Sequence, residues 1–166
     1  MGIATLPARY AGDSGIFCIV CVLFPIFRAM SDDAVVIDTN WVLDAWVFAD
    51  ARATALRLAV EAGRVRWLAT GAMRAELARV LDYPAVALRL ARRGMDAAEA
   101  LALFDALAQV LPAAPRAPVV CRDADDQPFI DLAVQHGAAL ISHDTHITRL
   151  RRPLARLGVA VLRAWP

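Results

Sequence analysis

Three carboxylates of this sequence stand at positions where parallel α/β proteins carry out chemistry. Asp38 directly follows the apolar run Ala34–Ile37, and Asp144 comes two residues after a second apolar run, Ala139–Ser142. Because ligands bind at the carboxyl ends of parallel strands, both acids are expected at that edge of a sheet. Asp126 lies in the first turn of the helix predicted before the second run, where the helix dipole also favours a carboxylate.

Glu76 is a fourth candidate and lies on the predicted helix Gly71–Leu81. The apolar side chains of this helix recur every three or four residues and form one buried stripe: Met73, Leu77, Val80 and Leu81. At about 100° of rotation per residue, Glu76 borders this stripe rather than facing bulk water. Its carboxylate can therefore point along the sheet toward the same edge.

Carboxylates gathered at one edge of a sheet repel each other, and a hard divalent cation is the usual resolution. Mg²⁺ and Mn²⁺ favour oxygen ligands and keep open positions for water and for a substrate phosphate. Such an ion can generate hydroxide and neutralise charge during phosphodiester hydrolysis. The four acids therefore indicate metal-dependent hydrolysis of a phosphodiester bond.

Each acid also has an ordinary structural interpretation when it is taken alone. An Asp that follows a strand is often a helix cap, and Glu76 is compatible with a plain surface position. Asp123, Asp125 and Asp126 together are compatible with a solvated loop. We expect Asp125 to be the N-cap of the helix that begins at about Asp126, which leaves Asp126 on the inward side.

The elements that must position these acids alternate between strands and helices. Short apolar runs predict strands at Ala34–Ile37, Val65–Leu68, Val119–Cys121, Ala139–Ser142 and Val159–Leu162. Helical periodicity predicts helices at Trp41–Phe48, Ala51–Glu61, Gly71–Leu81, Val86–Arg93, Asp96–Val110 and Asp126–His136. Asp96 and Glu99 form a capping-box pattern. This alternation predicts a doubly wound α/β fold with a parallel sheet.

The composition limits the number of domains and excludes some kinds of chemistry. The 166 residues, 59% of them hydrophobic, suit one compact domain, and the formal net charge of +1 gives no global attraction to nucleic acid. All 18 basic residues are arginine, which excludes a lysine-dependent phosphotransfer or Schiff-base mechanism. The three cysteines form no disulfide framework, and their odd number favours a reducing compartment, so we expect a cytoplasmic protein.

Residues 1–30 are expected to be an N-terminal appendage or the product of a mis-assigned start, with residues 31–166 as the functional domain. The apolar run Ile16–Phe27 is too short to span a bilayer, and its flanks do not match a signal peptide. Met30 is the expected alternative start, because the sequence after it leads straight into the first predicted strand.

Four motifs, in order, resemble the PIN-domain ribonuclease family. They are the strand-and-DTN segment Val36–Asn40, the segment Arg74–Leu77 around the second acid, Asp126 with the following helix to Gly137, and the late strand Leu140–Asp144. The resemblance spans Val35 to about Leu162, essentially everything after Met30. It is closest to the bacterial branch described as toxins of toxin–antitoxin pairs.

The resemblance implies a three-layer α/β/α sandwich with a parallel, Rossmann-like sheet of about five strands, and endonucleolytic cleavage of RNA. It implies that one or two Mg²⁺ or Mn²⁺ ions are held by Asp38, Glu76, Asp126 and Asp144. By the same resemblance, Asn40 would orient Asp38, while Thr39 or Ser142 would hydrogen-bond the acids that hold the metal.

One position departs from the family pattern. His146 stands where members often carry a further Asp, and imidazole is a poorer ligand for Mg²⁺ than for Mn²⁺. We expect His143 and His146 at the rim of the site rather than as obligate ligands.

The resemblance also sets expectations for partners. The expected partners are an RNA substrate, a small antitoxin protein and a second copy of the chain in a homodimer. No membrane association is expected. Arg149, Arg151 and Arg152 follow the fourth acid and offer bidentate contacts to RNA phosphates. The alternative function is a catalytically silent PIN-like module that binds protein or RNA. Retention of all four acids favours the enzyme.

Overall fold

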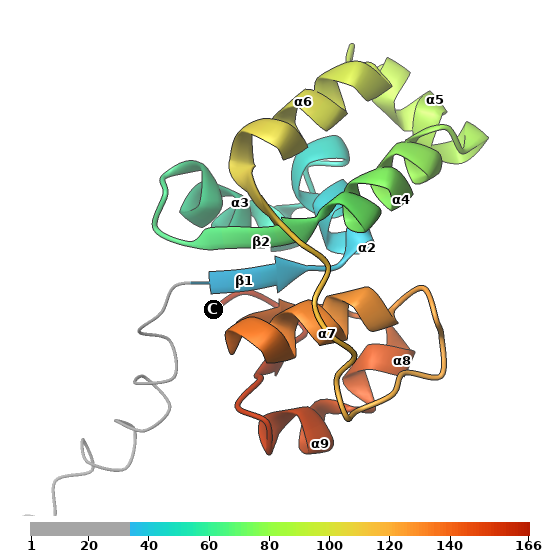
Figure 1. Cartoon of the computed structure of the whole chain (residues 1–166). Helices are drawn as coiled ribbons and strands as arrows, with labels where there is room; N and C mark the ends of the chain where they lie inside the picture. Colours follow the sequence, from blue (N-terminus) through green and yellow to red (C-terminus); the bar gives the residue numbers. More distant parts are fainter. Residues whose placement is uncertain (1–33) are drawn as a thin grey trace, which may run out of the picture. The chain divides into compact units, whose positions relative to one another are not determined.

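The protein forms a five-stranded, all-parallel sheet with helices along the chain between the strands (Figure 1). The computed structural model describes residues 34–166, so the expectations for Ile16–Phe27 and Met30 lie outside the described residues. The strand order is β3-β2-β1-β4-β5. The strands are β1 (Ala34–Ile37), β2 (Arg66–Thr70), β3 (Ala108–Leu111), β4 (Ala139–Ile141) and β5 (Val161–Leu162). The expected α/β/α fold with about five parallel strands is confirmed.

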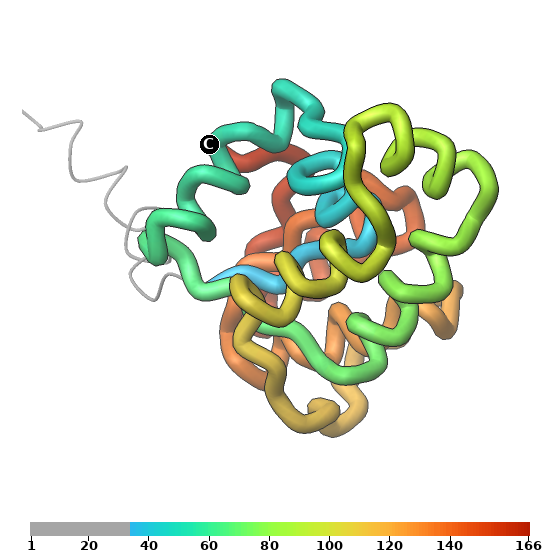
Figure 2. Tube along the Cα trace, turned by 90° about the horizontal axis from the view of Figure 1, so that it is seen from above, coloured from blue at the N-terminus to red at the C-terminus, as the bar shows by residue number. Residues whose placement is uncertain are grey.

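Strand β1 lies at the centre of the sheet, and all of its residues are buried. It pairs in parallel with β2 on one side and with β4 on the other, with Val36 opposite both Leu68 and Leu140. A short apolar run with no polar face is typical of a strand that is covered on both faces. Seen from above, β1 lies inside the fold, enclosed by the later segments of the chain (Figure 2).

The helices flank β1 on its two sides. Those between β1 and β3 lie on the β2 side of β1, and α7, α8 and α9 lie on the other (Figure 1). The first group comprises α2 (Thr39–Val42) with its π-helical continuation η1 (Leu43–Val47), the 3₁₀ turn η2 (Ala51–Ala53), α3 (Thr54–Glu61), α4 (Gly71–Leu81), α5 (Pro84–Arg92) and α6 (Ala97–Leu107). The second comprises α7 (Gln127–His136), α8 (Thr145–Thr148) and α9 (Arg151–Ala155).

Several local expectations are confirmed by these elements. Strand β1 and helix α4 have the predicted bounds. Asp96 and Glu99 make both hydrogen bonds of the capping box at the start of α6. Helix α7 ends at Gly137, whose φ of 59° is a left-handed conformation that glycine adopts at little cost.

The prediction of the third strand at Val119–Cys121 is wrong. The third strand is β3, in a segment that the helical periodicity assigned to the end of the predicted helix Asp96–Val110. Helix α6 instead ends at Leu107, and Ala108 adopts an extended conformation that pairs with Trp67 of β2. An apolar segment this short fits either a helix end or a strand, so pairing with β2 decides its conformation.

Two other expectations, one at the third acid and one after the fourth, need correction. Asp126, not Asp125, is the N-cap residue of α7, and its side chain makes no capping hydrogen bond. The two short helices α8 and α9 fill the stretch before β5, where no element was expected.

Within residues 34–166, no helix combines the length and the apolar character needed to cross a membrane.

Candidate active site

Asp38 directly follows the central strand and is only 4% exposed. The backbone N–H of Asp38 donates to the carbonyl of Ile141 at 3.0 Å, which continues the pairing of β1 with β4. Its carboxylate accepts hydrogen bonds from the backbone N–H of Asn40 at 3.3 Å and from the Ser142 hydroxyl at 2.6 Å. Burial raises the pKa of Asp38, while these two hydrogen bonds lower it.

Ser142 links the first acid to the fourth. Its fully buried hydroxyl donates to Asp38 Oδ2 and accepts the backbone N–H of Asp144 at 2.9 Å. Asp144 is the N-cap residue of α8, where its Oδ1 accepts the backbone N–H of His146 at 2.6 Å. The Ser142 hydroxyl therefore holds the Asp38 carboxylate after β1 and the Asp144 backbone after β4 in fixed positions.

Asp126 lies at the start of α7, with its carboxylate free of any helix-capping role. The pKa of Asp126 is raised to about 6, first by burial and then by repulsion from Asp144, Asp38 and Asp123. His146 opposes this shift. Repulsion among carboxylates from three separate segments shows that the fold brings these acids together.

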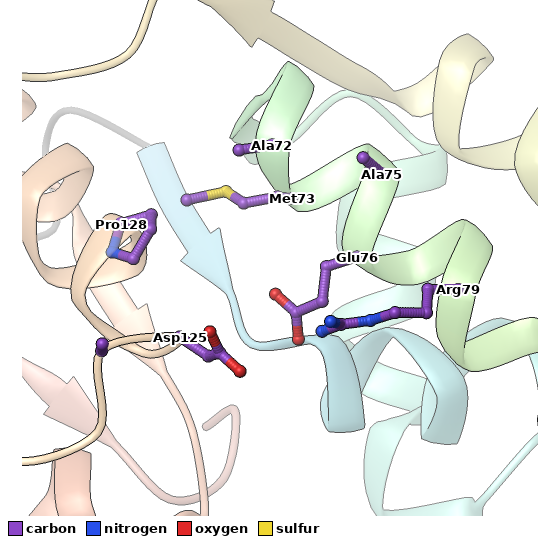
Figure 3. A pocket seen from close by; sticks show the side chains of 8 residues that line it. Ala72, Met73, Ala75, Glu76, Arg79, Asp125 and Pro128 are labelled. Carbon is purple, nitrogen blue, oxygen red and sulfur yellow. The ribbon is translucent and has the colours of Figure 1, made fainter.

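Glu76 approaches the same group from helix α4 and is half-buried. Burial raises its pKa, a hydrogen bond with the Thr39 side chain lowers it, and repulsion from Asp38 raises it. Figure 3 shows Glu76 and Arg79 projecting from α4 into a cavity of about 420 Å³, with Asp125 on the facing loop. All four predicted acids therefore lie at the carboxyl end of the sheet, with Glu76 on the border of the cavity.

The supporting residues lie beside these acids. Thr39 is buried at the start of α2, where its side chain hydrogen-bonds Glu76. Asn40 is exposed and reaches Asp38 through its backbone N–H. The predicted RNA-binding arginines are all exposed: Arg149 at the end of α8, and Arg151 and Arg152 at the start of α9.

Sequence reasoning missed the residues that hold the loop before α7 in place. Gln127, only 1% exposed, accepts the backbone N–H of Cys121 at 2.6 Å and donates to the carbonyl of Val119 at 3.1 Å. It also donates to Asp131 at 2.6 Å, and Asp131 accepts the backbone N–H of Ala117 at 2.9 Å. These bonds take the place of strand pairing in this loop. Two polar residues four positions apart, Gln127 and Asp131, among the apolar residues of α7 were the only signal in the sequence.

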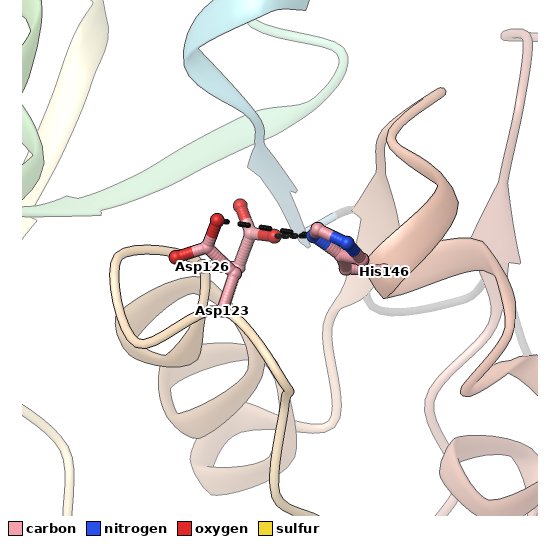
Figure 4. Close-up of side chains that lie close together, drawn as sticks. All are labelled: Asp123, Asp126 and His146. Atoms are coloured by element: carbon pink, nitrogen blue, oxygen red, sulfur yellow. Dashed lines mark ion pairs between the residues drawn. The ribbon is translucent and has the colours of Figure 1, made fainter.

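Asp123 and His146 are two further side chains at the site that the sequence did not identify as ligands. His146 Nδ1 lies 3.8 Å from Asp123 Oδ2 and 3.9 Å from Asp126 Oδ2 (Figure 4). It also lies 3.7 Å from Asp144 Oδ1. Ligand atoms of Asp123, Asp126 and His146 all lie within 4.8 Å of one another. The only sequence signal for His146 was its place where the family often has a carboxylate.

The donor set of this site fits a divalent cation. Its oxygen-rich ligands and open, solvent-facing side match the preferences of Mg²⁺ and Mn²⁺. The raised pKa values of Asp38, Glu76 and Asp126 show that burial and mutual repulsion disfavour the ionised carboxylates. A bound cation relieves that repulsion and supplies the missing countercharge.

Comparison with known proteins assigns the chain to a family. The family model described as PIN domain matches residues 34–146, which is more than half of the chain. The match contains the whole acidic site, from Asp38 to His146. No curated protein sequence matches the chain. The chain therefore belongs to the PIN-domain family, whose members are generally nucleases.

Proposed function

We propose that this protein is a metal-dependent endoribonuclease that hydrolyses RNA phosphodiester bonds. The observation that carries the proposal is the convergence of Asp38, Glu76, Asp126 and Asp144 at the carboxyl end of the sheet, with the pKa of Asp126 raised to about 6. Hydrolysis of a phosphodiester builds up negative charge on the phosphate, and crowded carboxylates hold the compensating positive charge as Mg²⁺ or Mn²⁺.

The four acids would hold the cation, and the neighbouring residues would keep them in position. When bound, the cation supplies an activated water and neutralises charge on the phosphate. Ser142 holds Asp38 and the backbone of Asp144 in one orientation. Thr39 holds Glu76 through its side-chain hydrogen bond. Metal ligands that are hydrogen-bonded in this way keep their geometry as substrate binds.

RNA is the proposed substrate, and the exposed arginines after the fourth acid support it. Arg149, Arg151 and Arg152 follow Asp144 within eight residues and are exposed, the first at the end of α8 and the other two on α9. Guanidinium groups bind phosphates in a bidentate manner. Because the net charge of the chain is only +1, a local cluster of this kind is needed for binding a polyanion.

Incubation of the purified protein with single-stranded and structured RNAs tests this function directly. The proposal expects internal cleavage in the presence of Mn²⁺ or Mg²⁺, and no cleavage when EDTA removes the cation. A matched set of DNA substrates separates RNA cleavage from general nuclease activity. RNA left intact at every Mn²⁺ concentration, by protein that binds Mn²⁺, would favour the silent binding module instead.

We also propose that the nuclease is the toxin of a toxin–antitoxin pair and acts in the cytoplasm. The resemblance of the four motifs to the bacterial toxin branch supports this role. The acidic edge of the sheet is the surface that a small antitoxin would cover. Induced expression in a bacterial host should slow growth, and an Asp38→Asn variant at equal level should not. Normal growth with soluble, nuclease-active protein would contradict the toxin role alone.

A further inference from the structure

The imidazole of His146 lies at nearly equal distances from three carboxylates. Its Nδ1 is 3.8 Å from Asp123 and 3.9 Å from Asp126, in the segment that leads into α7 (Figure 4). It is 3.7 Å from Asp144 at the start of α8. Within the described part of the chain, the imidazole makes no direct hydrogen bond to any of them, since such bonds are about 2.7–3.2 Å long. The three carboxylates therefore surround Nδ1 without any one of them pairing closely with it.

These spacings match ligands arranged around one ion. With metal–ligand distances of about 2.1 Å, adjacent ligand atoms are about 3.0 Å apart and opposite ones about 4.2 Å apart. The 3.7–3.9 Å separations lie between these limits. Small side-chain movements would bring the three ligand atoms, which lie within 4.8 Å of one another, around one cation.

The local hydrogen bonds leave Asp123 Oδ2 free for this role and engage Asp126 Oδ2 only through a weak thiol donor. Asp123 Oδ1 accepts the backbone N–H of Asp125 at 3.0 Å, and Asp123 Oδ2 is the oxygen that faces His146. Asp126 makes no capping bond, and its Oδ2, which also faces the ring, accepts a weak hydrogen bond from the Cys121 Sγ at 3.8 Å. The backbone N–H of His146 is held by Asp144, which fixes the position of the imidazole at the start of α8.

Imidazole changes which cation such a group prefers. Nitrogen donors suit transition-metal ions, whereas Mg²⁺ strongly favours oxygen ligands and retains its water. A carboxylate at position 146 would give an all-oxygen group without this discrimination. The imidazole of His146, in place of a carboxylate, thus changes one ligand of the site from oxygen to nitrogen.

We propose that Asp123, Asp126 and His146 form a cation subsite that prefers Mn²⁺ to Mg²⁺. This inference rests on the proposed metal-dependent function and deepens it, because Asp126 belongs both to this subsite and to the group around Asp38. Asp123 and His146 are then ligands of this protein in addition to the four family acids.

Pulsed electron paramagnetic resonance of Mn²⁺ added to the full-length protein tests the subsite without any cleavage assay. Coupling to an imidazole ¹⁴N appears only if a histidine binds Mn²⁺, and the chain has three histidines. The coupling should be present in the parent protein and lost in His146→Asp and His146→Ala. It should persist in His136→Gln, which alters an exposed histidine at the end of α7, and in His143→Gln.

Calorimetric titration with Mn²⁺ and Mg²⁺ gives the second readout. Asp123→Asn and His146→Ala should each weaken Mn²⁺ binding by about tenfold or more, as loss of a metal-site partner does. His146→Asp should reduce the preference for Mn²⁺ over Mg²⁺. Circular dichroism checks that each variant is folded. Because Asp123 is exposed, Asp123→Asn is the variant expected to disturb folding least.

The absence of ¹⁴N coupling in the parent protein, or coupling that survives His146→Ala, would overturn the subsite. RNA cleavage by a protein without this coupling would overturn the subsite and leave the proposed nuclease intact. Coupling without cleavage of any RNA would support the subsite and contradict the nuclease.

Discussion

The hydroxyl of Ser142 donates a 2.6 Å hydrogen bond to the carboxylate of Asp38, although 104 residues separate them in the sequence. Both side chains are buried at the carboxyl ends of the adjacent strands β1 and β4. The bond stabilises the ionised form of Asp38, because it lowers a pKa that burial raises. The orientation and the charge of the first acid therefore depend on the neighbouring strand.

Ser142→Ala should destabilise the protein and weaken its cation binding. The change leaves a buried carboxylate without its strongest hydrogen bond, which costs about 1–3 kcal/mol of the free energy of unfolding. The pKa of Asp38 should rise further, so Mn²⁺ binding should require a higher pH than in the parent protein. Urea unfolding and calorimetric titration across pH 5–8 measure both effects. Ser142→Thr, which keeps the hydroxyl, is the control, and equal behaviour of the two variants would contradict the role of the bond.

The stability of the metal-free protein should fall as the pH rises from about 4 to about 6. Asp126 has a pKa of about 6 in the folded protein, above its value of 3.8 when unperturbed, so the folded state holds more protons in this range. The burial-raised pKa values of Asp38 and Glu76 act in the same direction. Urea unfolding at several pH values should show a smaller decline for Asp126→Asn. Saturating Mn²⁺ should reverse the decline in the parent protein. A stability that instead rises through this pH range without metal would contradict the repulsion among the carboxylates of the site.

Gln127→Ala should loosen the loop that carries Asp123 and Asp126. The variant removes hydrogen bonds to Cys121 and Val119 and leaves buried polar groups unpaired, at a cost of about 1–3 kcal/mol. Mn²⁺ affinity should fall as well, because two carboxylates lose their fixed position. Gln135→Ala, at an exposed position of the same helix, is the matched control and should match the parent protein in unfolding and in Mn²⁺ titration. Unchanged Mn²⁺ affinity in Gln127→Ala would mean that the loop is held by other contacts.

Glu76→Gln should raise the melting temperature of the metal-free protein while it reduces cleavage. Burial and repulsion from Asp38 both disfavour the ionised Glu76, and a neutral amide removes that cost. The same change removes one of the four acids that would hold the cation. Thermal unfolding in EDTA and RNA cleavage in Mn²⁺ measure the two effects, with the exposed Asp82→Asn at the C-terminal end of α4 as a charge-matched control. Cleavage equal to that of the parent protein would remove Glu76 from the site.

The strands that end at functional acids could be predicted from the sequence, since buried parallel strands leave continuous apolar runs. The apolar runs before Asp38 and before Asp144 predicted a parallel sheet, and they placed both acids at its carboxyl edge, where chemistry is expected. Strand β3 could not be predicted in the same way, because its four residues continue the periodicity of α6 and only pairing with β2 makes them extended. The subsite around His146 depends on a loop geometry that no local pattern specifies.

The roles of Gln127 and Asp123 show the same limit at the level of single residues. Gln127 lies among apolar residues, and two of its partners are backbone groups that meet it only after the loop has folded back. Asp123 lies among other acids, so its type and spacing do not distinguish it from a solvated side chain. Side-chain contacts across a loop are set by tertiary packing, which sequence periodicity does not encode.

The central claim is that the four acids form the metal site of a ribonuclease. Its most direct test is the Mn²⁺-dependent rate of RNA cleavage by Asp38→Asn, compared with the parent protein under single-turnover conditions. Asn keeps the size of the side chain and remains a good N-cap for α2, so the variant should stay folded. The account predicts a loss of at least about a hundredfold at every Mn²⁺ concentration, with Asp82→Asn unaffected. A folded Asp38→Asn that cleaves RNA at the parent rate would contradict it.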